Sequence, residues 1–388
     1  MPQPPWRVTV VTNLLPPYRR ALYTRLQQRP EIAQLQLLLL ARSSQRRYPW
    51  ATPPSADGLQ ISVLPGISVQ VQGVTEWVLH LNWGIAARLR SSAPDLLVLS
   101  NYDAPAYWRA LLWARRRCPT VLLFESFAGS ATYQQGLIAA LKRFFLRRVD
   151  AVAAFGTQAA QWAHALGVPT ERIVTGINTV DMEWYRTQAL RWESSAELQR
   201  ARERYPVEGL LLYAGRLLPH KNVAAVLHAL ALAGTPELGL LIVGTGPEQP
   251  ALQELCRRLG IAQRVWFLPP QPPEQLPFYY VLADALVLPS RIEPWGLVVN
   301  EALACGMYVL CSRHAGAAYD LIQPGWSGEL FDPDVPEELA HHLRALPAQL
   351  PALRARREQI RQHACSTFSL EQLVDTMCRA FALASQSR

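Results

Sequence analysis

Two glutamates and a glycine near residue 300 are the residues whose types and spacing best suit chemistry. The segment Ser290–Gly306 reads SRIEPWGLVVNEALACG, which predicts a strand ending at Ser290, a loop carrying Glu293 and a helix starting near Gly296. The first N–H groups of a helix have no partner inside it, and the helix dipole favours negative charge there. Gly296 would let phosphate oxygens approach the backbone. The segment therefore predicts an anion site.

The two glutamates would flank such an anion. Glu301 lies about one turn into the predicted helix, where a carboxylate can accept hydrogen bonds from ribose hydroxyls. Glu293, on the loop, would point at whatever is attached to the phosphates. A surface helix whose glutamate is favoured by the dipole is the simpler alternative. The glutamates alone do not decide between the two.

A second segment adds two cations at the mouth of another strand-to-helix turn. Gly215–Asn222 reads GRLLPHKN and places Arg216 and Lys221 where they could meet a diphosphate from the opposite side. Arginine offers a flat bidentate fork and lysine a mobile point charge. The chain has only two lysines against 36 arginines, so a lysine at this place carries weight.

A glycine turn follows the next apolar run. Gly244, Gly246 and Pro247 belong to the segment GTGP, which opens a further helix and is predicted to lie close to a bound anion. Alone it is a weak signal, because any parallel sheet can turn through glycines.

Taken together, these segments resemble family 4 of the retaining glycosyltransferases, the glycosyl transferases group 1. The resemblance rests on Glu293 and Glu301 in E-x7-E spacing, on the GRL…KN turn, on GTGP, on DALVLPS (Asp284–Ser290) and on GWSGELFDP (Gly325–Pro333). It is close from Leu210 to Pro333. It implies the GT-B fold, which consists of two Rossmann-like doubly wound parallel-sheet domains facing across a cleft.

The resemblance also implies roles for single residues. Arg216 and Lys221 would neutralise the donor's diphosphate, Glu301 would hold the ribose, and Glu293 would contact the transferred sugar. The remaining donor-binding candidates are Gly215, Gly244, Gly246, Pro247, and the backbone of Trp295, Gly296 and Leu297. The family retains anomeric configuration, generally without a metal, by front-face displacement. One departure concerns Pro269 and Pro270, where the family commonly has glycine, so two N–H donors for the base are missing.

The order of elements supports two domains. At 388 residues the chain is too long for one ordinary core, and short apolar runs alternate with helical patterns through both halves, as in parallel sheets with crossover helices. We expect domains at 1–185 and 186–368, with a C-terminal helix at 369–388 that could return to the first domain. The predicted strands are Arg7–Asn13, Leu35–Ala41, Asp95–Asn101, Thr120–Ser126, Ala151–Gly156, Gly209–Gly215, Gly239–Gly246, Val265–Leu268, Ala285–Ser290 and Met307–Ser312.

The N-terminal half would bind the acceptor. The segment TNLLPPYR follows the first strand and looks like a subset of the family whose first loop lines the acceptor cleft. The acceptor-binding candidates are Asn13, Tyr18, Arg19, Tyr102 and Glu125. Glu125 could act as a base or orient the acceptor hydroxyl, or it could simply cap the next segment. No histidine occurs between His80 and His164, although many relatives carry one in this half.

Charge and composition limit the partners. The net charge of +8 favours an anionic partner, which could be nucleotide diphosphate, anionic lipid or nucleic acid, and charge alone does not choose among them. The helical segment Leu137–Arg148, apolar on one side and basic on the other, could rest on a membrane or be an ordinary crossover helix. No nucleic-acid motif is present.

The six cysteines form no CxxC pair, no HExxH occurs, and no tightly bound metal or cofactor is expected. The N-terminus lacks signal-peptide features, so we expect a cytoplasmic protein, peripheral to a membrane at most.

These observations predict an enzyme of the glycosyltransferase class. It would move a sugar from a nucleotide diphosphate sugar to a hydroxyl of a glycan, glycolipid or small metabolite. A nucleotide-sugar epimerase or a phosphorylase of the same plan is one alternative, and a non-catalytic GT-B binding module is another. An epimerase would need no acceptor, and a phosphorylase would need pyridoxal phosphate.

Overall fold

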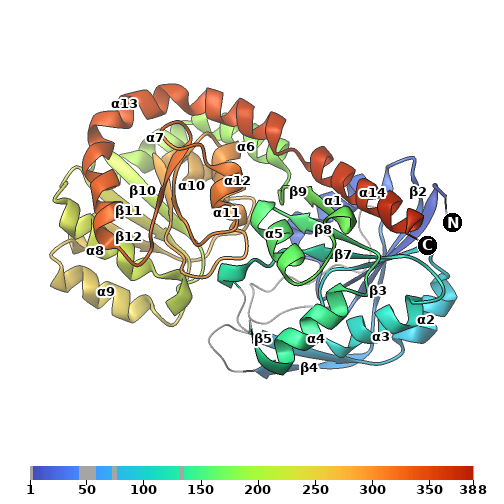
Figure 1. Cartoon of the computed structure of the whole chain (residues 1–388). Coiled ribbons are helices and arrows are strands. Elements are labelled where there is room, and N and C mark those ends of the chain that lie inside the picture. Colours follow the sequence, from blue (N-terminus) through green and yellow to red (C-terminus); the bar gives the residue numbers. More distant parts are fainter. Residues whose placement is uncertain (1–2, 43–57, 72–76, 131–134, 388) are drawn as a thin grey trace. The chain divides into compact units, whose positions relative to one another are not determined.

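The chain forms two compact units, each built around a parallel sheet (Figure 1). The computed structural model describes residues 3–42, 58–71, 77–130 and 135–387. Unit 1 comprises Met1–Val180 together with Leu370–Arg388, and unit 2 comprises Asp181–Ser369. The predicted α/β fold of two Rossmann-like parallel-sheet domains is confirmed.

The sheet of unit 1 has the strand order β3-β2-β1-β6-β7-β8-β9, and every neighbouring pair is parallel. The order reverses between β1 and β6. In such sheets ligands bind outside the carboxyl ends of the strands at this reversal. The strands are β1 (Trp6–Thr12), β2 (Ile32–Leu39), β3 (Gln60–Val63), β6 (Leu96–Leu99), β7 (Thr120–Phe124), β8 (Ala151–Phe155) and β9 (Ile173–Gly176).

Helices cover both faces of this sheet. Side chains alternate across a strand, so Val8 and Val10 of β1 join one apolar cluster while Val11 joins the other. The first cluster includes α1 and α14, and the second includes α2, α3, α4 and α5. The helices are α1 (Pro17–Gln27), α2 (Ile85–Ser92), α3 (Pro105–Ala114), α4 (Gly136–Leu146), α5 (Thr157–Ala165) and α14 (Leu370–Gln386). The sequence also predicts an amphipathic helical segment at Tyr133–Arg148, and its first two residues lie outside the described residues.

A two-stranded antiparallel hairpin, β4 (Gly66–Val71) and β5 (Trp77–Asn82), is separate from the main sheet of unit 1. The sequence analysis did not predict it. The backbone carbonyl of Asn82, at the end of β5, accepts a hydrogen bond from Arg109 Nη1 of α3 at 3.5 Å. The hairpin is thus attached to the helical layer on one face of the sheet.

The sheet of unit 2 repeats the same plan in the order β12-β11-β10-β13-β14-β15, again wholly parallel. The central strands β10, β11, β13 and β14 are buried throughout, which explains their largely apolar sequences, whereas the edge strands β12 and β15 are partly half-buried. The reversal lies between β10 and β13. The strands are β10 (Gly209–Ala214), β11 (Leu238–Val243), β12 (Val265–Leu268), β13 (Ala285–Leu288), β14 (Tyr308–Ser312) and β15 (Gly328–Phe331).

The helices of unit 2 include one of 32 residues, α13, which contains Pro347 and Pro351. Proline removes an intrahelical hydrogen bond and bends a helix, and Figure 1 shows α13 curving along the unit. The others are α6 (Met182–Glu193), α7 (Ala196–Arg202), α8 (Val223–Ala233), α9 (Gln249–Arg258), α10 (Leu276–Leu282), α11 (Leu297–Ala304) and α12 (Ala318–Leu321).

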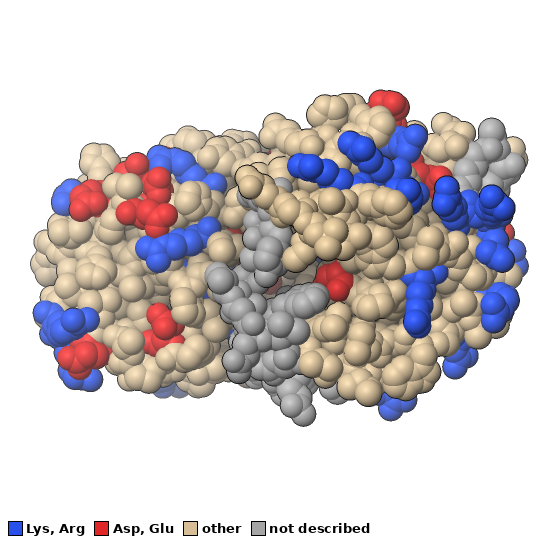
Figure 2. Space-filling view, turned by 60° about the horizontal axis from the view of Figure 1, so that its bottom comes forward, with Lys and Arg blue, Asp and Glu red and all other residues tan. Residues whose placement is uncertain are grey.

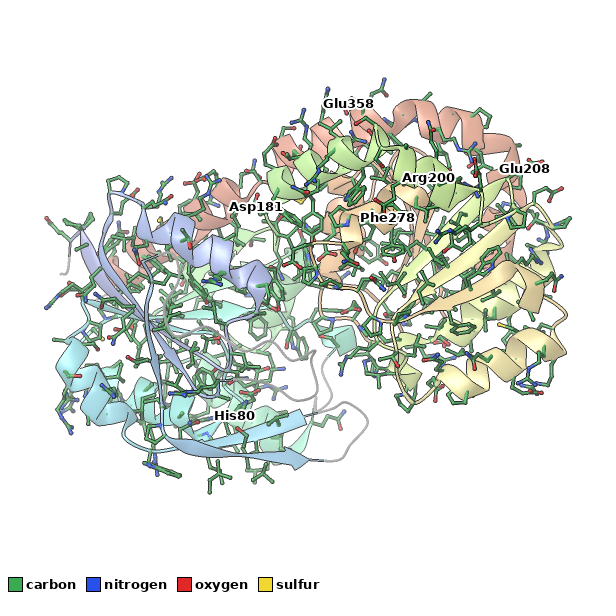
Figure 3. The ribbon with its side chains drawn as sticks, turned by 180° about the vertical axis from the view of Figure 1, so that it is seen from behind. His80, Asp181, Arg200, Glu208, Phe278 and Glu358 are labelled. Atoms are coloured by element: carbon green, nitrogen blue, oxygen red, sulfur yellow. The ribbon has the colours of Figure 1, made fainter. Side chains whose placement is uncertain are left out.

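The units divide after Val180, earlier than the expected boundary at residue 185. Asp181 caps α6, because its Oδ1 accepts the N–H of Trp184 at 3.1 Å. Helix α6 then packs as a whole on α10 and α11 of unit 2, with the ring of Trp192 edge-on to that of Phe278, a residue labelled with Asp181 in Figure 3. A boundary inside α6 would split this packing.

Candidate functional site

The candidate site of unit 2 lies at the carboxyl end of its sheet, on the two strands that flank the reversal. Gly215 and Arg216 follow β10, and a 3-10 turn, Pro219–Lys221, ends in the second predicted cation. Ser290–Gly296 follows β13, the neighbour of β10. The N–H of Arg291 donates to the carbonyl of His220 at 2.9 Å, which joins the two loops. The fold therefore brings both predicted segments to one place.

Lys221 and Glu293 form an ion pair between these loops. Lys221 Nζ lies 2.5 Å from Glu293 Oε2, and the side chains are 18% and 13% exposed. Ser290 Oγ adds a long hydrogen bond to the same carboxylate oxygen at 3.4 Å. An ammonium has three donors, so the pair leaves donors for phosphate oxygens. Two residues predicted from separate segments are thus in direct contact.

Arg216 is half-buried just after the end of β10, and a hydrogen bond from Tyr213 holds its backbone. The hydroxyl of Tyr213 donates to the carbonyl of Arg216 at 2.7 Å. Burial and then the charge of Glu293 raise the pKa of Tyr213, while the charge of Arg216 opposes them. The Tyr213 hydroxyl therefore stays protonated and remains a hydrogen-bond donor close to the charged side chains of Glu293 and Arg216. The sequence analysis missed it, because a tyrosine within an apolar strand gives no separate signal.

The glycines of GTGP hold two loops together. A Cβ on Gly244 would lie 1.9 Å from the carbonyl oxygen of Gly215, and one on Gly246 would lie 2.2 Å from that of Leu217. The N–H of Leu217 donates to the carbonyl of Thr245 at 2.9 Å. These glycines are required because the loop after β11 touches the backbone of the loop that carries Arg216. Their predicted contact with an anion stays a prediction.

The start of α11 also needs its glycine. Gly296 has φ +99°, and a Cβ there would meet Leu288 at 2.8 Å and Glu293 Cγ at 3.3 Å. Trp295 is buried, and its indole N–H donates to Asn300 Oδ1 at 2.9 Å, which fixes the loop on the helix. The N–H of Gly316 donates to the carbonyl of Glu293 at 3.0 Å. Gly316 was missed by the sequence analysis.

Glu301 is buried in α11 beneath this loop. The hydroxyl of Tyr280 donates to Glu301 Oε2 at 2.5 Å, and Tyr185 forms a further side-chain hydrogen bond with it. Burial raises the pKa of Glu301 to about 7, although both tyrosine hydrogen bonds oppose the rise. Neither tyrosine was predicted, because they come from α10 and α6. A ribose contact of Glu301 stays a prediction.

Glu301 should make the stability of unit 2 pH-dependent. Its pKa is raised in the folded chain, so its contribution is fully present below about pH 4.5 and is lost as the pH rises through about 7. Glu301→Gln should flatten this part of the profile, since glutamine can still accept the Tyr280 hydrogen bond. The free energy of unfolding, measured by urea titration from pH 4.5 to 8, checks this. An unchanged slope in the variant would assign the dependence to other groups.

In unit 1 the structure pairs two of the acceptor candidates. Arg19 Nη2 forms an ion pair with Glu125 Oε1, and the guanidinium lies 5.5 Å from the ring centre of Tyr18. The Arg19 side chain is 11% exposed, and its Nη1 is buried without a hydrogen-bond partner among the described residues. A buried, unsatisfied donor costs free energy unless something accepts from it. A ligand oxygen would satisfy it.

The other two acceptor candidates have their own partners. Asn13 Oδ1 accepts a hydrogen bond from the hydroxyl of Tyr107 at 2.8 Å. Tyr102 packs its ring on Phe124 and Phe145, and burial raises the pKa of Tyr102 to about 12. The second lysine of the chain, Lys142, places Nζ 5.4 Å from the Tyr102 ring centre. Asn13 and Tyr102 themselves follow the carboxyl ends of β1 and β6.

The described residues add neither a metal cluster nor a membrane-spanning helix to these sites. They contain no group of three or more His, Cys, Asp or Glu side chains that could hold a metal, and none of their helices is long and apolar enough to cross a membrane. A hollow of about 1060 Å³ opens at the amino end of the sheet of unit 2. Its buried carboxylate, Asp284, is already satisfied by Arg354 and by the N–H of Leu210. That hollow is therefore best explained as structural.

Comparison with known proteins gives its sequence matches mainly in the second unit. Residues 195–363 match the family described as glycosyl transferases group 1. The D-inositol 3-phosphate glycosyltransferase of Rhodococcus jostii is 35% identical over 189 residues, covering 46% of this chain and 41% of the relative. That of Geodermatophilus obscurus is 37% identical over 188 residues, with the same coverage. The chain thus spans about two fifths of the length of these relatives.

Solved structures match nearly the whole chain. HepE of Anabaena in complex with UDP has a TM-score of 0.75 at 17% identity, covering 97% of this chain and 99% of that one. Sucrose-phosphate synthase of Thermosynechococcus elongatus has a TM-score of 0.75 at 19% identity, covering 98% and 100%. At these identities the likeness establishes the fold, which is GT-B as the sequence predicted.

Proposed function

We propose that this chain is a retaining glycosyltransferase that moves a sugar from a nucleotide diphosphate sugar to a hydroxyl group. The observation that carries the proposal is the Lys221–Glu293 ion pair. This pair and Arg216 lie on the loops that follow the two strands flanking the sheet reversal. The family match of unit 2 supports it. So does the likeness to structures described in complex with UDP and UDP-glucose.

The proposed reaction does not use a metal ion bound by this chain. The bond between the anomeric carbon and the phosphate oxygen breaks, and a bond to the acceptor oxygen forms on the same face. The acceptor's proton passes to the departing phosphate. Lys221 and Arg216 stabilise the charge that develops on that phosphate. Glu293 orients Lys221 and contacts the transferred sugar.

Unit 1 would supply the acceptor contacts. Glu125 and Arg19 form a pair that leaves one buried donor, Arg19 Nη1, for an acceptor oxygen. Asn13, Tyr18 and Tyr102 complete the proposed set. The chain would work in the cytoplasm, consistent with six free cysteines, five of them buried. Contact of helix α4 with an anionic membrane is the proposed peripheral association, and nucleic acid is not a proposed partner.

A thermal-shift screen with UDP, GDP, ADP, CMP and dTDP sugars tests the donor site. A nucleotide at about 100 times its dissociation constant should stabilise the protein by about 2.7 kcal/mol. Addition of EDTA should leave the shift unchanged. If none of these nucleotides raises the midpoint, the donor-site assignment is wrong. Conversion of the bound nucleotide sugar into a different nucleotide sugar, without any acceptor, would favour an epimerase instead.

A further inference from the structure

Most of the large apolar side chains exposed on the described residues gather on one part of unit 1. Thirteen such side chains are strongly exposed, and nine of them belong to the β4–β5 hairpin, the adjoining Trp83, α3 and α4. Single exposed apolar residues are ordinary on protein surfaces, whereas a contiguous group marks an interaction site. The question is which partner this group fits.

The hairpin turns one apolar face outward. Ile67 pairs directly with Leu81 across the strands, and Val69 lies two residues further on the same face. These side chains are 59%, 40% and 44% exposed. The opposite face carries His80, which is buried (Figure 3), and Asn82, whose Nδ2 donates to the carbonyl of Leu40 at 2.9 Å. The anchored face is therefore polar and the solvent-facing one apolar, the reverse of the usual arrangement.

Helix α4 also turns apolar side chains outward. Leu137, Ile138, Leu141 and Phe144 are 77%, 52%, 46% and 44% exposed, while the inward side of the helix joins the core. Trp108 of α3 stacks on Phe144, with ring centroids 6.1 Å apart. Because α3 also holds the hairpin through Arg109, it connects the two apolar faces (Figure 1). We call the outward sides of the hairpin, α3 and α4 the basic-apolar face.

The charged side chains within the described strands and helices of this face have one sign. No Asp or Glu occurs in β4, β5, α2, α3 or α4. Arg115, Arg116 and Arg117 follow α3 and are exposed, as are Arg143 on α4 and Arg147 and Arg148 directly after it. Figure 2 brings this side of unit 1 forward and shows Lys and Arg along the edge of a broad surface with few acidic residues.

We propose that the basic-apolar face docks on an anionic lipid bilayer, with the hairpin and α4 as two separate insertion points. Exposed Leu, Ile, Phe and Trp enter the headgroup boundary, and the surrounding arginines pair with anionic headgroups. A second copy of the chain fits less well, because self-association through one patch would bring its arginines together. The sequence alone suggested only the helix; the hairpin is added by the structure. The inference does not depend on the proposed glycosyl transfer.

Vesicle sedimentation with the full chain tests this. The protein should bind vesicles of 70% phosphatidylcholine and 30% phosphatidylglycerol, bind pure phosphatidylcholine far more weakly, and dissociate as sodium chloride is raised. The double variants Ile67→Thr with Val69→Thr, and Leu137→Gln with Leu141→Gln, should each lower the partition coefficient more than tenfold. Changing Arg143, Arg147 and Arg148 to Gln should lower it roughly 100-fold.

The matched control is Leu190→Gln with Leu232→Gln, which removes two exposed leucines from unit 2 and should leave partitioning unchanged. Threonine suits strands and glutamine suits helices, so thermal midpoints should stay close to that of the parent. Equal binding to both vesicle types would overturn the proposal, as would wild-type partitioning of the hairpin variant. A concentration-dependent dimer that the hairpin variant abolishes, without vesicle binding, would assign the face to a second copy.

Discussion

Lys221→Ala should lower the rate of nucleotide release from the donor sugar by about 100- to 1000-fold, because it removes a cation aimed at the leaving phosphate. The midpoint of thermal unfolding should fall by only a few degrees, since Glu293 keeps its Ser290 contact and some exposure to water. Steady-state release, with the nucleotide sugar that gives the largest thermal shift, measures the effect. Lys221→Arg should recover part of the rate.

Arg257→Ala is the matched control for this change. It breaks an ion pair with Glu254 on the exposed surface of α9, in the same unit but away from the sheet reversal. Exposed pairs contribute little, so both rate and midpoint should stay near the parent values. A rate for Lys221→Ala within threefold of the parent would refute the proposed role of the Lys221–Glu293 pair.

Gly244→Ala should abolish measurable donor binding and destabilise unit 2 by about 3 kcal/mol. The added Cβ would lie 1.9 Å from the carbonyl oxygen of Gly215, and no rotamer change can move either a Cβ or a backbone carbonyl. The loop that carries Arg216 must therefore shift. Isothermal titration with the nucleotide and chemical unfolding measure the two effects.

Gly234→Ala separates this collision from simple backbone strain. Gly234 ends α8 with φ +65°, and a Cβ there would meet nothing within 4 Å. Its replacement should cost about 1 kcal/mol and leave donor binding intact. If Gly244→Ala behaved like Gly234→Ala, the contact between the two loops would not matter for the site.

Much of the fold could be predicted because the central strands are buried on both faces. Such strands are continuous apolar runs, so Gly209–Gly215 was predicted for a strand observed at Gly209–Ala214. The contact between Lys221 and Glu293 has a second cause. Their loops follow β10 and β13, and neighbouring parallel strands end at the same edge of a sheet. Likewise, Arg19 and Glu125 both follow strands of unit 1, and they meet.

What the sequence did not reveal depended on tertiary contacts or on conflicting local signals. Pro347 and Pro351 argue against a helix, yet α13 continues through both because it packs on α8 and α11. Tyr280 and Tyr185 reach Glu301 from α10 and α6, and nothing in their own neighbourhoods marks them. The hairpin was missed because its apolar face is turned toward solvent, against the usual pattern.

The path of the chain has a consequence for dissecting the molecule. The chain leaves unit 1 after Val180 and re-enters it at Leu370, so unit 2 is an insertion within unit 1. Leu373, Met377 and Phe381 of α14 belong to the same core as α1 and β1. A fragment stopping at residue 180 would leave that core open to water. Unit 2, by contrast, can be excised as one continuous stretch, and the severed ends of unit 1 joined by a short linker would restore its missing helix.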